Sequence, residues 1–542
     1  MMNTAREILC AAYTAASPLP DAHSLHLALR GEDGVFEPLN YGIGVLFAEA
    51  DFSSGKPAGE TIVLDQPVLT RLENGRIAVT ALLSSVDGEP RGTASWETED
   101  LVHFTRLPEP LVHSAPSGSA EIDGESVAAS LLDLTEQEAD YLRRKLGEVK
   151  NISADPIEIT LAAGEELRLP PLTARYSDGS AEEIPVEWDA ASLAAVDTGR
   201  PGEYAVTGRA VVKEYRTPIL WGIADPMVLR YEGFYNFYFL VGTNEYTEGR
   251  DLWIRHSDTI EGLTGAEGVC IFHATESGDH SGCNWAPELH VIGGKLCCLF
   301  ASSTNGEWNH VQSRIMVCEH NPTVPEQWSE PVRVTRADGS PLIENGITLD
   351  MTYFEANGKS YYCWAQRTID ERGTDSSDLM IAPVDPAHPE RLAGEPVLLC
   401  RPKYAWDRQH TEVDEGPHVL KHDGKLYMSY SGDSVSDYYC LGWLIADEDA
   451  ELLDPASWER TGYPVLAREH VAAERGPGHN SFTKDEYGRD VIIYHAKPDG
   501  GMRSFFARTI HYGFDGTPLL TLTPERWLLP ELRTVTAKVT VR

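Results

Sequence analysis

Short runs of alternating hydrophobic and polar residues fill most of this chain, and turn dipeptides that contain glycine separate them. Such runs occur at residues 25–29, 157–161 and 360–364, and turns follow the pattern of Asp178-Gly179 and Asn357-Gly358. A period of two with closely spaced turn residues is typical of antiparallel strands. The pattern predicts an all-β protein.

One pattern recurs five times in the second half of the chain. A polar residue comes first, then a strand, a turn with Gly at its second position, and an aromatic-rich strand. The opening residues, at intervals of 62 to 65 residues, are Asp225, Glu288, Asp350, Glu415 and His479. Near-equal units of this kind predict a five-bladed β-propeller, and because every blade starts at the central axis we expect the five residues to converge.

The rest of the chain divides by composition. The predicted organisation is a β-rich accessory module at 1–118, a linker and one helix at 119–150, a small β-sandwich at 151–213, and the propeller at 214–542. The linker is rich in Ser, Ala, Pro and Gly, and Thr135 with Glu138 forms a capping box for the helix. The predicted helix face consists of Leu131, Leu132, Leu134, Ala139, Leu142 and Leu146. The sandwich segment resembles bacterial immunoglobulin-like domains, which act as spacers.

Charge and cysteine usage narrow the class of partner. The 84 acidic and 45 basic residues give a formal net charge of −39, which disfavours nucleic acid and anionic membranes. No apolar run reaches the roughly 20 residues of a membrane span.

Nine scattered cysteines resemble buried small hydrophobes more than a disulfide framework. With no leader visible, these features predict a cytoplasmic protein, or a secreted one if a leader has been removed; they do not predict an oligomeric state.

Converging carboxyl groups point to glycoside hydrolysis. A buried ionised carboxylate costs several kcal/mol unless it is paired, so acids at one axis indicate function. Cleavage of a glycosidic bond needs one protonated carboxyl that donates to the leaving oxygen and one ionised carboxylate that acts on water. A third acid nearby raises the proton affinity of the donor.

Residues 217–525 resemble glycoside hydrolase family 43. Ala224-Asp-Pro226 matches the motif of the general base, Leu349-Asp350 that of the tuning acid, and Glu415-Gly-Pro417 that of the general acid. The resemblance implies a five-bladed propeller in which Asp225 is the base, Asp350 orients and tunes, and Glu415 is the acid. The segments 285–290, 476–482 and 503–508 are similar to those of exo-acting α-L-arabinofuranosidases.

Five further residues are candidates for substrate binding: Trp285, Glu288, Trp364, Arg503 and Arg508. Trp285 and Trp364 lie beside predicted rim loops, where an indole can stack on a sugar, although each can pack in the core instead. Glu288 opens a blade but matches no acid or base motif, so we expect it to bind substrate hydroxyls or hold an arginine. The two arginines belong to the terminal segment of the resemblance.

His479 is the candidate for a metal. It is either a structural histidine or, as the resemblance implies, it faces a Ca²⁺ or Na⁺ ion in the propeller channel; calcium prefers oxygen ligands, which favours an ion held mostly by water. No organic cofactor is expected.

The predicted function is an inverting exo-glycosidase that releases terminal α-L-arabinofuranose from arabino-oligosaccharides or xylan fragments. The alternatives are a β-xylosidase, which would use the same three acids, and a carbohydrate-binding propeller without turnover.

Overall fold

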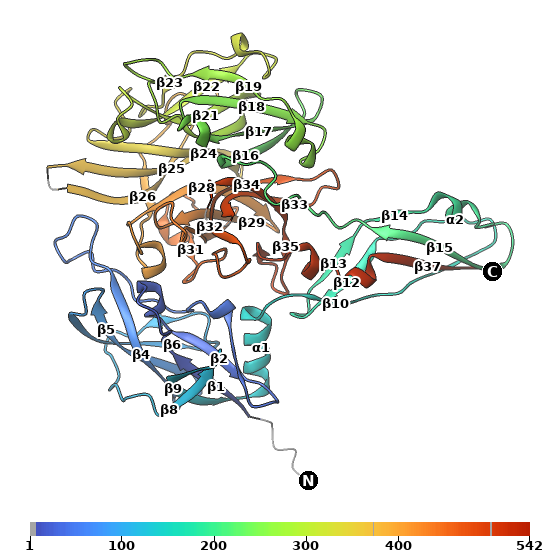
Figure 1. The fold of residues 1–542 in the computed structure, drawn as a ribbon, viewed down its shortest axis with the longest axis horizontal. Coiled ribbons are helices and arrows are strands. Elements are labelled where there is room, and N and C mark those ends of the chain that lie inside the picture. Colours follow the sequence, from blue (N-terminus) through green and yellow to red (C-terminus); the bar gives the residue numbers. More distant parts are fainter. Residues whose placement is uncertain (1–6, 372, 499–500) are drawn as a thin grey trace.

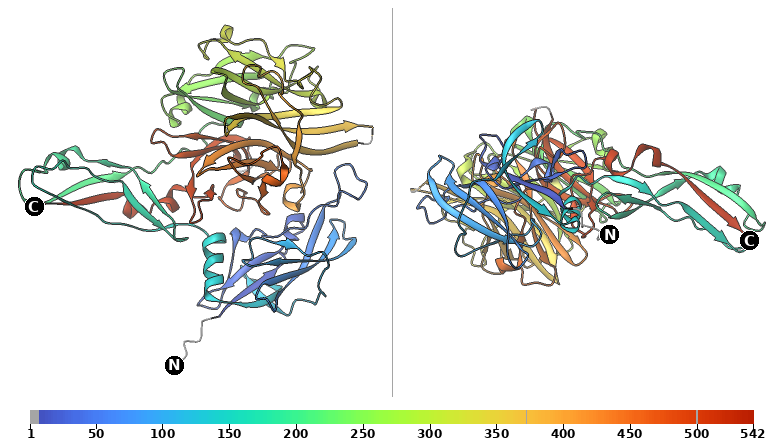
Figure 2. Two further views of the ribbon diagram at one scale, coloured as in Figure 1. Left: turned by 180° about the vertical axis from the view of Figure 1, so that it is seen from behind. Right: turned by 90° about the horizontal axis from the view of Figure 1, so that it is seen from below.

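Three β-rich regions make up the molecule. The computed structural model describes residues 7–371, 373–498 and 501–542, so the first six residues of the predicted N-terminal module lie outside the described residues. Figure 1 shows the N-terminal module, an elongated region that carries the C-terminus, and a large group of sheets formed by β16 to β34. The views in Figure 2 show the elongated region extending away from the other two. The prediction of an all-β protein is confirmed.

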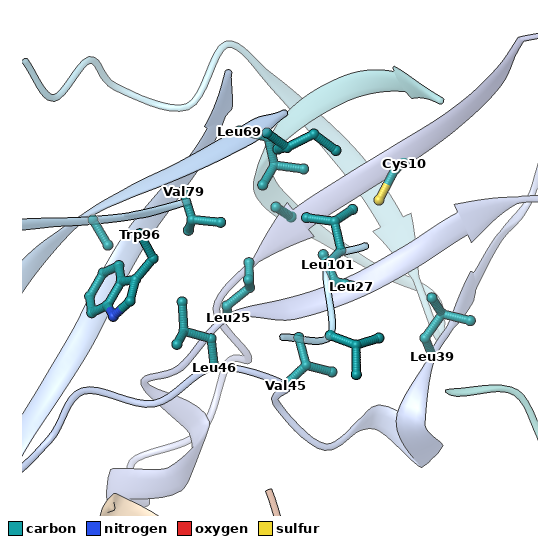
Figure 3. Close-up of a cluster of buried hydrophobic side chains, with 14 of the residues drawn as sticks. Cys10, Leu25, Leu27, Leu39, Val45, Leu46, Leu69, Val79, Trp96 and Leu101 are labelled. Atoms are coloured by element: carbon teal, nitrogen blue, oxygen red, sulfur yellow. The ribbon is translucent and has the colours of Figure 1, made fainter. Parts of the chain in front are cut away.

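The N-terminal module consists of two sheets packed on a common core. One sheet has the order β3-β2-β1-β9-β8, with β1 (Ile8–Tyr13), β2 (His26–Arg30), β3 (Phe36–Pro38), β8 (Gly118–Ile122) and β9 (Glu125–Leu134). The other contains β4 (Ile62–Arg71), β5 (Ile77–Ser85), β6 (Pro90–Thr98) and β7 (Thr105–Arg106). Leu27, Val79 and Trp96 meet between the sheets, as Figure 3 shows.

The prediction of a linker and then a helix from residue 119 is wrong up to residue 134. These residues form β8 and β9, and β9 pairs with β1 in the first sheet. Leu134 therefore joins the sheet core instead of a helix face. These residues form strands for a physical reason. Apolar residues of β9 complete the core of the module, and the Thr135 cap sets the start of the helix at Glu136.

Helix α1 (Glu136–Leu146) begins at the predicted capping box. Thr135 Oγ1 accepts from Glu138 N at 3.3 Å, and Glu138 Oε2 accepts from Thr135 N at 2.8 Å. Its buried face is Ala139, Leu142 and Leu146, three of the six predicted residues; Leu131, Leu132 and Leu134 lie in β9 instead.

The elongated region is a small β-sandwich completed by the end of the chain. Its sheets are β10 (Asn151–Ala154), β12 (Leu172–Tyr176) and β13 (Ala181–Ile184) against β11 (Ile157–Leu161), β37 (Thr534–Val541), β15 (Gly202–Ala210) and β14 (Val186–Trp188), with α2 (Ala190–Ala194) after β14. β37 runs parallel to β11 and antiparallel to β15. The predicted boundary at 214–542 is therefore wrong for the last strand, because the alternating Val535, Ala537 and Val539 fill the core of this sandwich.

Five consecutive antiparallel sheets form the largest region. The first four are β16 (Ile223–Tyr231) to β19 (Val269–His273), β20 (Trp285–Ile292) to β23 (Val332–Arg333), β24 (Gly346–Ala356) to β27 (Val397–Cys400), and β28 (Asp414–His422) to β31 (Glu459–Arg460). Their middle strands are β17 (Phe237–Asn244), β18 (Asp251–Ser257), β21 (Lys295–Ser303), β22 (Val311–Cys318), β25 (Lys359–Asp370), β26 (Gly373–Pro383), β29 (Lys425–Gly432) and β30 (Cys440–Asp447). The fifth sheet contains β32 (Glu474–Lys484), β33 (Asp490–Pro498) and β34 (Ser504–Thr509); β35 (His511–Tyr512), β36 (Pro518–Leu519) and α3 (Pro524–Trp527) lead to β37.

Tight turns set the register of these sheets. Both residues of Gly293-Gly294, Asn357-Gly358 and Asp423-Gly424 have positive φ, as two-residue type I′ hairpins require. The first hairpin differs from the prediction. The repeated pattern predicts a two-residue turn at Glu232-Gly233, but the loop spans residues 232–236, with Tyr235 and Asn236 in the left-handed region.

The first strand of each sheet packs against the first strand of the next, and β32 packs against β16. Hydrogen bonds cross several of these junctions: Ala286 N donates to Thr243 Oγ1 at 2.8 Å, His479 N to Ser431 Oγ at 2.8 Å, and Ser481 Oγ to Pro226 O at 3.1 Å. Leu220, just before β16, also bridges to Phe505 of β34.

Candidate active site

A bulge with a left-handed residue interrupts the first strand of every one of the five sheets. The left-handed residues are Asp225, Ala286, Asp350, Gly416 and His479, with φ between 42° and 57°, and the strand pairing shifts at each of them. A bulge bends a strand and re-aims its side chains. The structurally equivalent positions are therefore not quite those of the sequence repeat: Ala286 takes the place expected for Glu288, and Gly416 that expected for Glu415.

Asp225 is a buried carboxylate surrounded by cationic and hydrogen-bonding groups. It is 6% exposed, and Arg503 Nη1 lies 3.1 Å from its Oδ1. Thr243 Oγ1 donates to its Oδ2 at 2.6 Å, and the Asp225 backbone N donates to His495 Nδ1 at 3.1 Å. Burial by itself raises the pKa of Asp225, but Arg503 and His479 outweigh burial and hold that pKa well below its usual range. Asp225 is thus an ionised carboxylate.

Asp350 and His479 face each other beside Asp225. His479 Nδ1 lies 3.4 Å from Asp225 Oδ1 and 3.8 Å from Asp350 Oδ2. Burial lowers the pKa of His479, but the charges of Asp225 and Asp350 raise it above the ordinary value. Burial and then the nearby charges of Glu415 and Asp225 raise the pKa of Asp350 well above its usual range, against the opposing effect of His479. The imidazole therefore lies between one carboxyl whose pKa is lowered and one whose pKa is raised.

Glu415 approaches the same site from the fourth sheet. Tyr439 OH donates to Glu415 Oε1 at 2.7 Å, and the next backbone N, of Gly416, donates to Asp350 Oδ2 at 3.1 Å. Burial raises the pKa of Glu415, although the Tyr439 hydrogen bond and His479 oppose it, and the charge of Asp225 raises it further. Asp225 and Glu415 thus have pKa values displaced in opposite directions, as a base and an acid require.

Glu288 lies two residues beyond the bulge and holds a histidine. Its Oε2 is 2.6 Å from His290 Nε2, and it is 5% exposed. The expectation that it holds an arginine is wrong, because the bulge at Ala286 turns the carboxylate towards His290. His418 stacks on His290 with ring centroids 6.2 Å apart, and neither ring nitrogen of His418 has a hydrogen-bond partner among the residues that the structure describes.

Two of the predicted substrate-binding residues are structural. Trp364 is fully buried in the core between the second and third sheets. Arg508 is 6% exposed, and its guanidinium donates to Glu474 and Tyr494 OH within β32 and β33 and to Leu520 O. Both predictions are wrong, because the inward-facing side of a strand buries these side chains against neighbouring strands.

Arg503 lies at the site, and Trp285 directly precedes the bulge at Ala286. Trp285 opens β20 and is partly exposed. Arg503 bridges Asp225 and Glu245, whose Oε1 lies 2.5 Å from Arg503 Nη2.

Sequence reasoning missed three residues that complete the site: Thr243, Tyr439 and His495. The ring of His495 stacks on Tyr439 with centroids 5.5 Å apart, and burial lowers the pKa of His495 to about 4. All three come from second strands or strand connections, where no motif marks them. A buried His within the apolar run of β33 was the available signal.

The side chains around His479 do not suit direct chelation of calcium. Ca²⁺ takes six to eight oxygen ligands. The oxygens facing His479 belong to Asp225 and Asp350, and His479 itself offers nitrogen. Among the residues that the structure describes, the group whose ligand atoms lie within 4.8 Å of one another is Asp251, Cys270 and His273, at the outer edge of the first sheet.

All nine cysteines are unpaired, and six of them are buried. Within the described part of the chain, no helix is long and apolar enough to cross a membrane.

Comparisons with known proteins agree with this architecture. The model of glycosyl hydrolases family 43 matches residues 215–518, and that of the bacterial Ig-like domain (group 4) matches residues 154–213. An extracellular exo-α-(1→5)-L-arabinofuranosidase of Streptomyces chartreusis is 33% identical over 285 residues, which are 52% of this chain and 82% of that protein. The α-L-arabinofuranosidase 43 of Humicola insolens is 34% identical over 277 residues, 50% of this chain and 54% of that protein. The crystal structure of an α-L-arabinofuranosidase from Lactobacillus brevis is 30% identical with a TM-score of 0.51, covering 57% of this chain and 97% of that one.

Proposed function

Because this chain belongs to family 43 of the glycosyl hydrolases, we propose that it is an inverting, exo-acting α-L-arabinofuranosidase in which Asp225 is the base and Glu415 the acid. The observation that carries the proposal is the opposite displacement of two pKa values at one site: that of Asp225 is lowered and that of Glu415 is raised. The substrate class rests on the relatives, which are named arabinofuranosidases.

The proposed reaction follows from these protonation states. Glu415, kept protonated by burial, donates its proton to the glycosidic oxygen as the bond to the anomeric carbon breaks. Asp225, kept ionised by Arg503 and His479, accepts a proton from the water that attacks the opposite face of the sugar. Asp350 accepts a hydrogen bond from Gly416 N, next to Glu415, and the charge interaction between the two carboxyl groups tunes the acid. Trp285 and Arg503 are the proposed contacts to the sugar.

We also propose that the five sheets are the blades of a closed five-bladed propeller. Support comes from the repeated bulge, from the packing of β32 against β16, and from the bridge between Leu220 and Phe505. These contacts bring the first and last sheets together. The site would then lie on the axis, at the end where the first strands begin.

A Ca²⁺ or Na⁺ ion on the axis remains a prediction. The imidazole of His479 already supplies positive charge between two carboxyls, so an ion there would keep mostly water as its ligands. As to location, the extracellular relative favours the secreted alternative over the cytoplasmic one.

A panel of nitrophenyl glycosides tests the proposal. We expect release from the α-L-arabinofuranoside. Release from the β-xyloside alone would indicate the β-xylosidase alternative, and release from neither, with binding of arabino-oligosaccharide, would indicate a propeller without turnover. Proton NMR in the first minutes of reaction should show the β-anomer of arabinose, since inversion of an α-glycoside gives β.

A further inference from the structure

The connection from the third to the fourth sheet ends at the proposed acid. Residues 401–413 run from β27 to the start of β28, where Asp414 and Glu415 follow directly. A segment of the N-terminal module, residues 49–61, lies against this connection. Ala50 N donates to Lys403 O at 2.7 Å, and Lys403 Nζ lies 2.9 Å from Glu49 Oε1. The module also lies beside the third and fourth sheets in Figure 1.

The module and these sheets share one hydrophobic core. Ile43, Phe47 and Val63 of the module pack in the same buried cluster as Ala405 and Trp406 of the connection. The boundary between the two regions is therefore a continuous interior, and the connection is sandwiched between the module and the sheets.

Arg408 fastens the connection to the module. Its side chain is fully buried, with Nε donating to Thr61 Oγ1 at 2.9 Å and Nη2 to Ala58 O at 2.9 Å. Nη1 donates to Pro402 O at 3.0 Å within the connection itself. A buried guanidinium is costly unless its donors are satisfied, and here the module supplies three acceptors, Thr61 Oγ1, Ala58 O and Gly59 O.

A buried ion network continues from Arg408 to the acid. Asp407, the neighbour of Arg408, pairs with Arg460, and Arg460 Nη2 also lies 3.1 Å from Asp414 Oδ2. Both carboxyl groups are completely buried. Because successive side chains of a strand point to opposite faces, anchoring Asp414 fixes the direction in which Glu415 points.

We infer that the N-terminal module is part of the acid side of the active site, and that Arg408 is a positioning residue for Glu415. The module accepts hydrogen bonds from Arg408, and these fix the position of the connection. The ion pairs of Asp407, Arg460 and Asp414 then fix the strand that carries the acid. This inference rests on the proposed role of Glu415 as the proton donor. It gives a function to a module that lies outside the part of the chain matched by the hydrolase family model.

Leaving-group dependence distinguishes positioning of the acid from a general structural role. A dinitrophenyl leaving group departs without protonation, whereas an unsubstituted phenol or a sugar needs the acid. We therefore expect Arg408→Met to hydrolyse the dinitrophenyl glycoside at close to the wild-type rate. On the phenyl glycoside we expect a loss in kcat of at least about tenfold, part of the 10²–10⁴ that a general acid supplies.

Two further variants complete the experiment. Thr61→Val removes one acceptor of Arg408 but keeps Arg408 itself. It should therefore lower kcat on the phenyl glycoside selectively, by less than Arg408→Met does. If Arg408→Met does not fold, Thr61→Val provides the test. Lys403→Met is the matched control, because it breaks an ion pair with the module and leaves Arg408 in place. It should leave kcat unchanged on every substrate of the series.

An equal loss on every leaving group, or no loss in folded Arg408→Met and Thr61→Val, would overturn the inference. The sugar preference of the wild-type enzyme distinguishes failure of this inference from failure of the proposed function. If the wild type prefers the β-xyloside, the proposed sugar is wrong, and the same leaving-group series is run on xylosides.

Discussion

Arg503 controls the protonation of Asp225, and its removal should shift the pH dependence of catalysis. Arg503 Nη1 lies 3.1 Å from Asp225 Oδ1, and both groups are largely buried. Opposite charges about 4 Å apart attract by about 4 kcal/mol at an effective dielectric constant of roughly 20. Arg503→Met removes this attraction and leaves burial, which raises the pKa of Asp225, opposed mainly by His479.

The sign of the shift follows from the role of the base. Asp225 acts while ionised, so activity is present above its pKa and is lost as the pH falls through it. Because Arg503 holds that pKa well below its usual range, the acidic limb of the kcat/KM profile of the wild type should lie at low pH. In Arg503→Met the acidic limb should move to higher pH, while the alkaline limb, set by Glu415, should move much less.

The assay is the kcat/KM profile on the nitrophenyl arabinofuranoside. Arg503→Lys keeps a positive charge and should shift the limb less than Arg503→Met. Arg475→Met is a matched control, since it removes an exposed arginine of β32 that pairs with Asp437. A folded Arg503→Met whose acidic limb coincides with that of the wild type would refute the reasoning.

Three further predictions concern single groups. Asp350→Asn should move the alkaline limb to lower pH, because the pKa of Glu415 falls when the coupled carboxyl is removed; an unchanged limb would exclude the tuning role. Arg508→Met should lower the free energy of unfolding by about 3–5 kcal/mol, since it leaves Glu474 buried without its partner, with KM unchanged in any folded fraction. Chelator treatment should lower Tm and leave catalysis partly intact if an axial ion is bound; complete loss of activity, restored only by zinc, would indicate a metallohydrolase instead.

Strand patterns and motifs predicted the sheets and the three acids, but not the bulges. The repeat placed Glu288 and Glu415 at equivalent positions, whereas the left-handed residues are Ala286 and Gly416. A bulge adds one residue to a strand, and the interval between repeats is the same wherever in the strand that residue falls, so spacing alone does not locate it. The consequence is chemical: Glu415 precedes its bulge and reaches the site, whereas Glu288 follows its bulge and pairs with His290.

Long-range pairing was the other feature that the sequence did not reveal. The alternation of Val535, Ala537 and Val539 predicts a strand, but only the structure shows that its partners are β11 and β15, more than 300 residues earlier. The charge partners of the site are equally remote. Arg503 lies 278 residues from Asp225, and no local pattern links the two.

The most direct test of the account compares Asp225→Asn and Glu415→Gln with the wild type on the nitrophenyl arabinofuranoside, with circular dichroism to establish the fold. Each change keeps the shape of the side chain and removes its ability to exchange a proton. We predict that each lowers kcat by at least about 10²-fold, since general acid or base catalysis contributes at least that much. A wild-type rate in either cleanly folded variant would contradict the assignment of these two carboxyls as acid and base.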